Sequence, residues 1–280
     1  MSEIKNLYSI ETGNFKLDGG AMFGVVPKVI WEKTNPADDL NMIDMAARSL
    51  LIETTHKLIL IDAGLGDKQN EKFFSHYYKW GEHSIESSIK RAGFSIGDIT
   101  DVFFTHLHFD HCGGAIIRKG GRLMPRFANA TFWINKDHWE WATSPNSREK
   151  ASFLPENILP LKDSGRLNLI NGNEKPLGFD ILTVSGHTEK MMLPFLSYKN
   201  KTIVFVSDLI PTAGHIKTPY IMGYDTRPLL TLKEKSSFLE KAAKKNFLLF
   251  LQHDVKYEII DIKKENNKFN LNKTFKLEDI

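Results

Sequence analysis

The stretch 105–114 concentrates side chains that bind transition metals. Four candidate ligands fall within six positions of it: His106, His108, Asp110 and His111. Imidazole and carboxylate groups together form a ligand set that suits zinc and its first-row neighbours. Alternate residues of an extended segment share one side, so His106 and His108 can hold one ion together. Asp110 and His111 are adjacent and point in different directions once the chain turns, which favours a second ion beside the first.

The alternative is a group of histidines that serves only the hydrophobic core. A lone buried histidine is usually of that kind, but three histidines and an aspartate so close together are not. Burying that many polar groups without a metal costs too much free energy. The run 101–104 before the cluster predicts a short buried strand, so the candidate ligands lie where a strand ends. Gly113 and Gly114 behind it let the backbone turn tightly and approach the site closely.

Five segments share one pattern, an apolar strand with a ligand-type residue just past its carboxyl end. The strands are 58–61, 102–104, 181–184, 203–206 and 248–251, and the residues that follow them include Asp62, His106, His187, Asp208 and His253. Open sheets with helix-covered faces place ligand sites at such ends. Polar residues commonly follow strands, but five cases together with the histidine cluster predict one shared site.

This combination resembles the metallo-β-lactamase superfamily, whose mark is a His-x-His-x-Asp-His motif followed by distant His, Asp and His ligands. The resemblance extends from the Asp62-Ala63-Gly64 turn to His253. It implies an α/β fold, a four-layer αβ/βα sandwich in a single domain over residues 1–280. The metals of such a fold lie at one edge, between the two sheets.

By resemblance, the chain binds two divalent metal ions, with zinc as the default and manganese, iron or cobalt as alternatives. The first ion would be bound by His106, His108 and His187, the second by Asp110, His111 and His253, and Asp208 would bridge the two. Asp62 would orient the cluster through hydrogen bonds, which metal-binding histidines generally require.

Within the superfamily, lactamases with a cysteine ligand in the second site do not fit. The one cysteine, Cys112, falls where the resemblance places a small packing residue. A bridging Asp208 indicates the binuclear hydrolases, which include lactonases, organophosphate hydrolases, thioesterases of the glyoxalase II kind and nucleases. The chain length and the segment 207–212 resemble the quorum-quenching N-acyl-homoserine lactonase branch and its organophosphate-hydrolysing relatives. Those lactonases often carry a tyrosine at the position of Pro211, and the candidates to replace it are Tyr220, Tyr224 and His215.

The metal set predicts hydrolysis, with a metal-bridging hydroxide attacking an electrophilic carbon or phosphorus. Asp110 and Asp208 are the predicted catalytic residues, and Asp110 could relay a proton to the leaving group. The first hypothesis for the substrate is a lactone or carboxylic ester with an apolar substituent. The second hypothesis is a phosphotriester substrate. A nuclease and a non-enzymatic metal-binding protein are further alternatives. The residues predicted to line the substrate pocket are Met22, Phe23, Phe109, Ile210, His215 and Tyr220.

The composition narrows the partners and the compartment. The chain has 280 residues, of which 41% are hydrophobic and 25% charged, as in ordinary globular proteins. A net charge of +3 is too weak to indicate nucleic acid or a membrane surface, which counts against a nuclease. No apolar run approaches the length of a membrane span, and residues 1–13 lack the apolar core of a secretory signal. One cysteine excludes an intrachain disulfide and suits a reducing compartment. We therefore expect a cytoplasmic enzyme that acts on a small molecule and can form a homodimer.

Several further segments have a predicted conformation. We expect a hairpin from the strands 48–54 and 57–61, a helix over 84–92 capped by Ser84, and a β-hairpin in 255–277. The pattern Thr231-Leu232-Lys233-Glu234 predicts a capping box that opens a helix running to about Lys245.

Three features remain ambiguous in the sequence. The glycine-rich stretch 18–24 is either a surface loop or a flap whose Met22 and Phe23 contact a ligand. The aromatic segment 73–80 is a lid or only packing. His138 is expected on the surface and not among the metal ligands.

Overall fold

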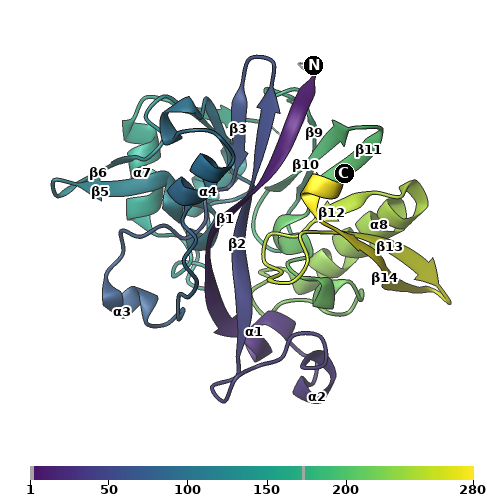
Figure 1. Ribbon diagram of the computed structural model, residues 1–280. Coiled ribbons are helices and arrows are strands. Elements are labelled where there is room, and N and C mark those ends of the chain that lie inside the picture. The colour runs from purple at the N-terminus through teal and green to yellow at the C-terminus, as the bar shows by residue number, and fades with distance from the viewer. Residues whose placement is uncertain (1–2, 172–173) are drawn as a thin grey trace.

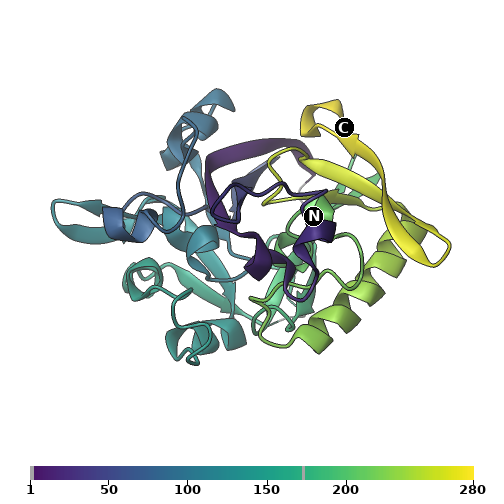
Figure 2. The same cartoon turned by 90° about the horizontal axis from the view of Figure 1, so that it is seen from below.

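Two six-stranded β-sheets face each other in the computed structural model, which describes residues 3–171 and 174–280 (Figure 1). The first sheet has the order β1-β2-β3-β4-β7-β8 and the second the order β14-β13-β12-β11-β10-β9. The N-terminal half of the chain, purple to teal in Figure 1, builds the first sheet, and the green and yellow C-terminal half builds the second. Helices lie on the outer sides of both, as Figure 2 shows for the long light-green helix α8. The predicted αβ/βα sandwich is confirmed.

The first sheet combines a long antiparallel pair with a parallel region. Its strands are β1 (Ile4–Asp18), β2 (Met42–Thr54), β3 (Leu58–Ile61), β4 (Asp101–Phe103), β7 (Thr131–Asn135) and β8 (Leu167–Ile170). The predicted hairpin is confirmed, because β2 and β3 pair in antiparallel fashion. All four residues of β3 are buried, as expected of an apolar strand covered on both faces. The strand β1 runs through Gly13 with an irregularity in its pairing with β2 between Glu11 and Asn14.

The second sheet is mostly antiparallel. Its strands are β9 (Asp180–Val184), β10 (Met191–Tyr198), β11 (Lys201–Phe205), β12 (Leu248–Phe250), β13 (Ile259–Glu265) and β14 (Lys268–Phe275). The strands β11 and β12 pair in parallel, which brings their carboxyl ends to the same edge. The predicted C-terminal hairpin is confirmed, and Asn266 and Asn267 turn it with φ of 49° and 59°. A separate small hairpin consists of β5 (Ile116–Lys119) and β6 (Arg122–Pro125).

Most helices are short connections between strands. They are α1 (Gly19–Phe23), α2 (Lys28–Trp31), α3 (Glu71–Phe74), α4 (Ile85–Arg91), α5 (Phe109–Cys112), α6 (Lys136–Thr143), α7 (Pro155–Asp163) and α8 (Pro228–Lys245). Single 3-10 turns are η1 (Ile96–Asp98), η2 (Gly113–Ala115), η3 (Ser207–Leu209), η4 (Ala213–His215) and η5 (Leu277–Asp279). None of the helices in residues 3–171 and 174–280 has the length and apolar character needed to cross a bilayer.

Two helix starts test the capping patterns. Ser84 caps α4 in a capping box with Ser87, so that predicted start is confirmed. The predicted start at Thr231 is wrong, because α8 begins at Pro228, a residue preorganised for the first helical turn. Glu234 consequently does not cap its own helix, and its carboxylate accepts from the backbone N–H groups of Ser185 and Gly186.

Candidate metal centre

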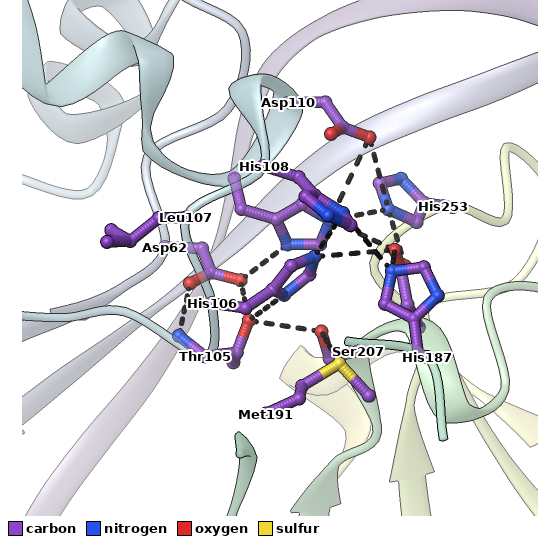
Figure 3. Close-up of polar contacts among 12 residues, drawn as sticks. Asp62, Thr105, His106, Leu107, His108, Asp110, His187, Met191, Ser207 and His253 are labelled. Carbon is purple, nitrogen blue, oxygen red and sulfur yellow. Dashed lines mark hydrogen bonds and ion pairs between the residues drawn. The ribbon is translucent and has the colours of Figure 1, made fainter. Parts of the chain in front are cut away.

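The strand ends that the sequence singled out do meet in space. His106 and His108 follow β4, His187 follows β9, Asp208 follows β11, and His253 follows β12. Figure 3 shows the rings of His106, His108, His187 and His253 gathered at one place. Two groups of buried side chains form there: His106, His108, His187 and Asp208 in one, and Asp110, His111 and His253 in the other. The first sheet and its loops supply His106 to His111, and the second sheet supplies the remaining three. The site therefore lies across the seam between the two halves.

The first group places three imidazole nitrogens around one point. Nδ1 of His108 lies 3.1 Å from Nε2 of His106 and 3.2 Å from Nε2 of His187. Oδ2 of Asp208 lies 3.0 Å from the same nitrogen of His187. A tetrahedral zinc ion with Zn–N bonds of about 2.1 Å separates its ligands by about 3.4 Å. Spacing and chemistry of these four donors therefore fit a divalent cation between them.

The second group adjoins the first through Asp208. Nε2 of His253 lies 3.3 Å from Nε2 of His111 and 3.7 Å from Oδ2 of Asp110. Oδ1 of Asp208 lies 3.0 Å from Nε2 of His253, whereas its Oδ2 lies 3.0 Å from Nε2 of His187 and 3.4 Å from Nε2 of His111. A carboxylate that contacts both donor groups has the position of a bridging ligand. The residues that the structure describes thus fit two divalent ions side by side.

Each of the five imidazoles has a partner on its other ring nitrogen. The pairs are His106 Nδ1 with Thr105 Oγ1 at 3.1 Å, His108 Nε2 with Glu149 Oε1 at 3.4 Å, His111 Nδ1 with Asp62 Oδ2 at 2.9 Å, His187 Nδ1 with Asp225 Oδ1 at 2.8 Å, and His253 Nδ1 with the Ala46 carbonyl at 2.8 Å. Such partners fix the tautomer and orientation of a metal-binding imidazole. Sequence reasoning found Asp62 but missed Asp225 and Glu149, because both lie in loops with no strand before them.

Asp62 links the end of β3 to the end of β4 through hydrogen bonds. Its carboxylate accepts from the backbone N–H and the hydroxyl of Thr105, each at 2.8 Å, besides contacting His111. Its backbone has φ 57°, a left-handed conformation that aspartate tolerates better than most residues. Just after α5, the backbone at Gly114 packs directly against the turn that follows Asp62. A Cβ on Gly114 would lie 2.0 Å from the carbonyl oxygen of Ala63. Glycine is therefore required there, as predicted.

Asp208 is a buried carboxylate at the point where the two donor groups meet. Burial raises the pKa of its carboxyl, but His111, His187 and His253 outweigh that effect and hold the pKa well below its ordinary value. Burial likewise raises the pKa of Glu149, and its contacts with the side chains of His108, Thr188 and Trp141 outweigh this effect and lower the pKa to about 2. Both groups are consequently carboxylates near neutral pH, the state in which they attract a cation or an imidazole N–H.

A cavity of about 330 Å³ opens above the candidate ligands. Its apolar lining comes from Leu17, Met22, Met45, Phe109 and Met222. Tyr77, Tyr224 and Arg148 add polar groups, and Asp110, His187, Asp208 and His253 are exposed to it. Within the ambiguous segments, Met22 of α1 and Tyr77 both reach the cavity. The rings of Phe73 and Tyr77 also pack on Phe109, with centroids 5.4 and 4.6 Å apart.

Four predicted pocket residues do not line this cavity. Phe23, next to Met22 on a short helix, points elsewhere and stacks between Trp31 and His215. Ile210 is fully buried in the core of the C-terminal half. Tyr220 packs its ring against the edge of Phe23. His215 is buried, and its ring nitrogens are taken by the Thr212 hydroxyl and the Met22 carbonyl, so it supports α1 from behind.

The prediction for His138 was half wrong. This side chain is fully buried, not on the surface, because its Nε2 accepts from the backbone N–H of Leu107 at 2.9 Å. Leu107 lies between His106 and His108, so His138 holds the loop that carries them. Cys112 is also buried, and its thiol donates to the carbonyl of Leu107 at 3.3 Å. Neither residue belongs to the two donor groups.

Known proteins share this sequence pattern. The family model of the metallo-beta-lactamase superfamily matches residues 44–253. An N-acyl homoserine lactonase from a Bacillus species is 24% identical over 268 residues, which cover 91% of this chain and 95% of the relative. The N-acyl homoserine lactonase AiiA of Bacillus thuringiensis subsp. kurstaki is 25% identical over 271 residues, with the same coverage.

Solved structures share the fold. A probable metal-dependent hydrolase from Staphylococcus aureus superposes with a TM-score of 0.87 at 27% identity, over 98% of this chain and 100% of that one. AidC, a dizinc quorum-quenching lactonase in complex with a product, superposes with a TM-score of 0.80 at 24% identity, over 96% and 95% of the two chains. At that identity the likeness to AidC concerns the fold alone.

Proposed function

Because the chain belongs to the metallo-β-lactamase superfamily, we propose that it is a binuclear metal-dependent hydrolase of lactones or carboxylic esters. The observation that carries the proposal is the position of Asp208. Its carboxylate contacts histidines of both donor groups and also borders an apolar cavity. A purely structural metal site needs neither a bridging carboxylate nor an open side.

In this proposal His106, His108 and His187 hold one ion, Asp110, His111 and His253 hold the other, and Asp208 holds both. Zinc suits these donors best, and manganese, iron or cobalt would also accept them. Two such ions, when bound, activate a water at neutral pH and polarise the oxygen of the bond to be cleaved. The protein must then bind and orient the substrate and handle its protons.

Asp110 is suited to proton transfer. Its Oδ2 faces the second donor group, 3.8 Å from His111 and 3.7 Å from His253. Its Oδ1 has no such contact among the described residues, and the side chain borders the cavity. We assign to Oδ1 the relay of a proton that the attacking water gives up and the leaving alkoxide receives, because such a group has to lie within hydrogen-bond reach of the leaving atom.

Tyr224 takes the place of the tyrosine that is absent at Pro211. It lines the cavity, whereas Tyr220 and His215 do not. Burial, Tyr77, Asp18 and Asp110 all raise the pKa of its phenol, so the hydroxyl keeps its proton. A protonated phenol can donate to the carbonyl oxygen of a substrate as negative charge develops there.

The cavity supports an apolar substituent on the substrate. Six of its side chains, Ala151 included, are aliphatic, thioether or phenyl groups, and among the described residues Arg148 is the one basic side chain of the lining apart from the histidines. The names of the relatives, N-acyl homoserine lactonases, agree with this chemistry.

We place the enzyme in the cytoplasm, since its one cysteine is buried and free. Recovery of the protein from a periplasmic or culture-medium fraction would contradict that location.

The test is a comparison of kcat/KM for a long-chain lactone and an aryl phosphotriester with the same zinc loading. We expect the lactone to be the better substrate and activity to disappear after chelation. Higher kcat/KM for the phosphotriester would make the protein an organophosphate hydrolase instead. No hydrolysis of either substrate by protein that holds two ions would refute the proposed substrate class.

A further inference from the structure

His108 differs from its two neighbours in the first donor group by the nitrogen that it presents. His106 and His187 point Nε2 at the shared centre, whereas His108 points Nδ1 at it. A neutral imidazole carries its one proton on either nitrogen. His108 can offer the lone pair of Nδ1 only when that proton lies on Nε2, so something must keep it there.

Glu149 is the group that faces Nε2 of His108. Its Oε1 lies 3.4 Å from that nitrogen, and the glutamate side chain is 3% exposed. The other oxygen, Oε2, is already occupied, because it accepts from Trp141 Nε1 at 2.6 Å and from Asn146 Nδ2 at 2.8 Å. Neither Oε1 nor Nε2 forms a hydrogen bond of standard geometry among the described residues, and the nearby Thr188 hydroxyl is unpaired as well. Oε1 is the carboxylate oxygen that faces Nε2.

The segment that carries Glu149 is held in place on both sides of the cavity. The backbone N–H of Phe109, the residue after His108, donates to the carbonyl of Ser152 at 3.0 Å. Phe153 packs against the His108 ring with centroids 4.8 Å apart, which limits rotation of the ring. On the far side, the Arg148 guanidinium donates to the carbonyl of Gly223. The carboxylate is thus presented by a fixed segment and not by a free loop.

We propose that Glu149 is a positioning residue that keeps the proton of His108 on Nε2 and so directs Nδ1 toward the first donor group. The inference rests on the proposed metal-dependent function. Without the carboxylate, Nε2–H would be buried and unpaired, and the tautomer with the proton on Nδ1 would become populated. Loss of such an outer partner typically weakens metal binding by about 10- to 100-fold.

The test uses Glu149→Ala and Glu149→Gln in the full chain, with Glu189→Gln as the matched control. The Glu189 carboxylate accepts from the Arg227 guanidinium at 2.6 Å, and within the described part of the chain its side chain forms no hydrogen bond or ion pair with the two donor groups. Imidazole ¹⁵N shifts of the metal-free proteins report the tautomer of His108, and competition with a chromophoric chelator reports zinc affinity. We expect the wild type and the control to keep the Nε2–H tautomer. Glu149→Ala should populate both tautomers and bind its first zinc ion about 10- to 100-fold more weakly.

The outcomes separate this inference from the proposed function. Wild-type protein that binds fewer than two zinc ions would refute the binuclear enzyme itself. Wild-type protein that binds two ions, with Glu149→Ala unchanged in both tautomer and affinity, would overturn only the role of Glu149. Glu149→Gln keeps the size of the side chain and a neutral acceptor, so it should lie between wild type and alanine. If Glu149→Ala does not fold, Glu149→Gln provides the test. A glutamine variant with the tautomer and the zinc affinity of the wild type would then overturn the role of the Glu149 charge.

Discussion

Oδ1 of Asp225 lies 2.8 Å from Nδ1 of His187, and both side chains are almost fully buried. Asp225 is distant from every predicted ligand in the sequence, yet it fixes the ring of His187 as Asp62 fixes that of His111. The carboxylate therefore belongs to the support of the candidate metal centre and offers its most direct test.

Asp225→Asn should weaken binding of the first zinc ion by about 10- to 100-fold, because the amide is a weaker acceptor for the His187 N–H. Chelator competition measures this change. Asp98→Asn, at an exposed position in a 3-10 turn, is the control and should match the wild type. Equal affinities for the Asp225 variant and wild type would show that the contact is not needed for metal binding.

Two ions per chain are expected when the protein is purified without chelator. Elemental analysis should approach two equivalents of metal, and Asp208→Ala should hold at most one because its carboxylate faces both groups. Removal of the metal should abolish hydrolysis, and added zinc should restore it. A folded wild-type protein that saturates at one ion under metal excess contradicts the bridging assignment.

Tyr224→Phe should lower kcat for lactones by up to about 10²-fold, the typical loss for one donor to a developing oxyanion. Tyr220→Phe is the matched control, since the Tyr220 ring packs against Phe23 outside the cavity. Both variants should retain two ions. A larger loss of kcat in the Tyr220 variant than in the Tyr224 variant would reverse the assignment.

His138→Ala should destabilise the protein without removing a metal ion. The substitution leaves the Leu107 N–H buried without its acceptor, which costs about 1–3 kcal/mol. Thermal unfolding measures the loss and elemental analysis the metal content. A variant that unfolds like wild type but has lost one ion would identify His138 as a ligand.

Lys235 should make the stability of the protein depend on pH in the alkaline range. Burial lowers the pKa of its ammonium from 10.5 to about 7, while the amine donates to the carbonyl oxygens of Lys217 and Tyr220. Between these two pKa values the unfolded chain binds more protons than the folded one, so the free energy of unfolding rises with pH. One such group contributes at most about 1.4 kcal/mol per pH unit.

Urea unfolding at pH 7, 8.5 and 10 tests this contribution. The wild-type free energy of unfolding should rise relative to that of Lys235→Met across the series, because methionine has no proton to release. If the free energies of unfolding of the two proteins changed with pH in parallel, the pKa of Lys235 would not be lowered in the folded state.

Predictability from the sequence was uneven for a physical reason. Residues such as Asp208 and His253 follow apolar strands, and parallel or adjacent strands carry their ends to one edge, so local pattern sufficed to place them. Asp225 and Glu149 reach the site from loops, whose course depends on tertiary packing and leaves no periodic signal. The pocket was predicted in part, because Met22 and Phe23 are neighbours in sequence, but the short α1 directs only the first into the cavity.

Both donor groups draw on the two halves of the chain, and this has a kinetic consequence. His106 and His108 come from the first sheet, whereas His187 and Asp208 come from the second. Neither half alone holds a complete set of donors, so high-affinity uptake of an ion during refolding must wait until the sheets have docked. The rate at which a metal indicator loses its ion to refolding protein would therefore report the docking step, and an ion bound by donors from both sheets would hold the two sheets together.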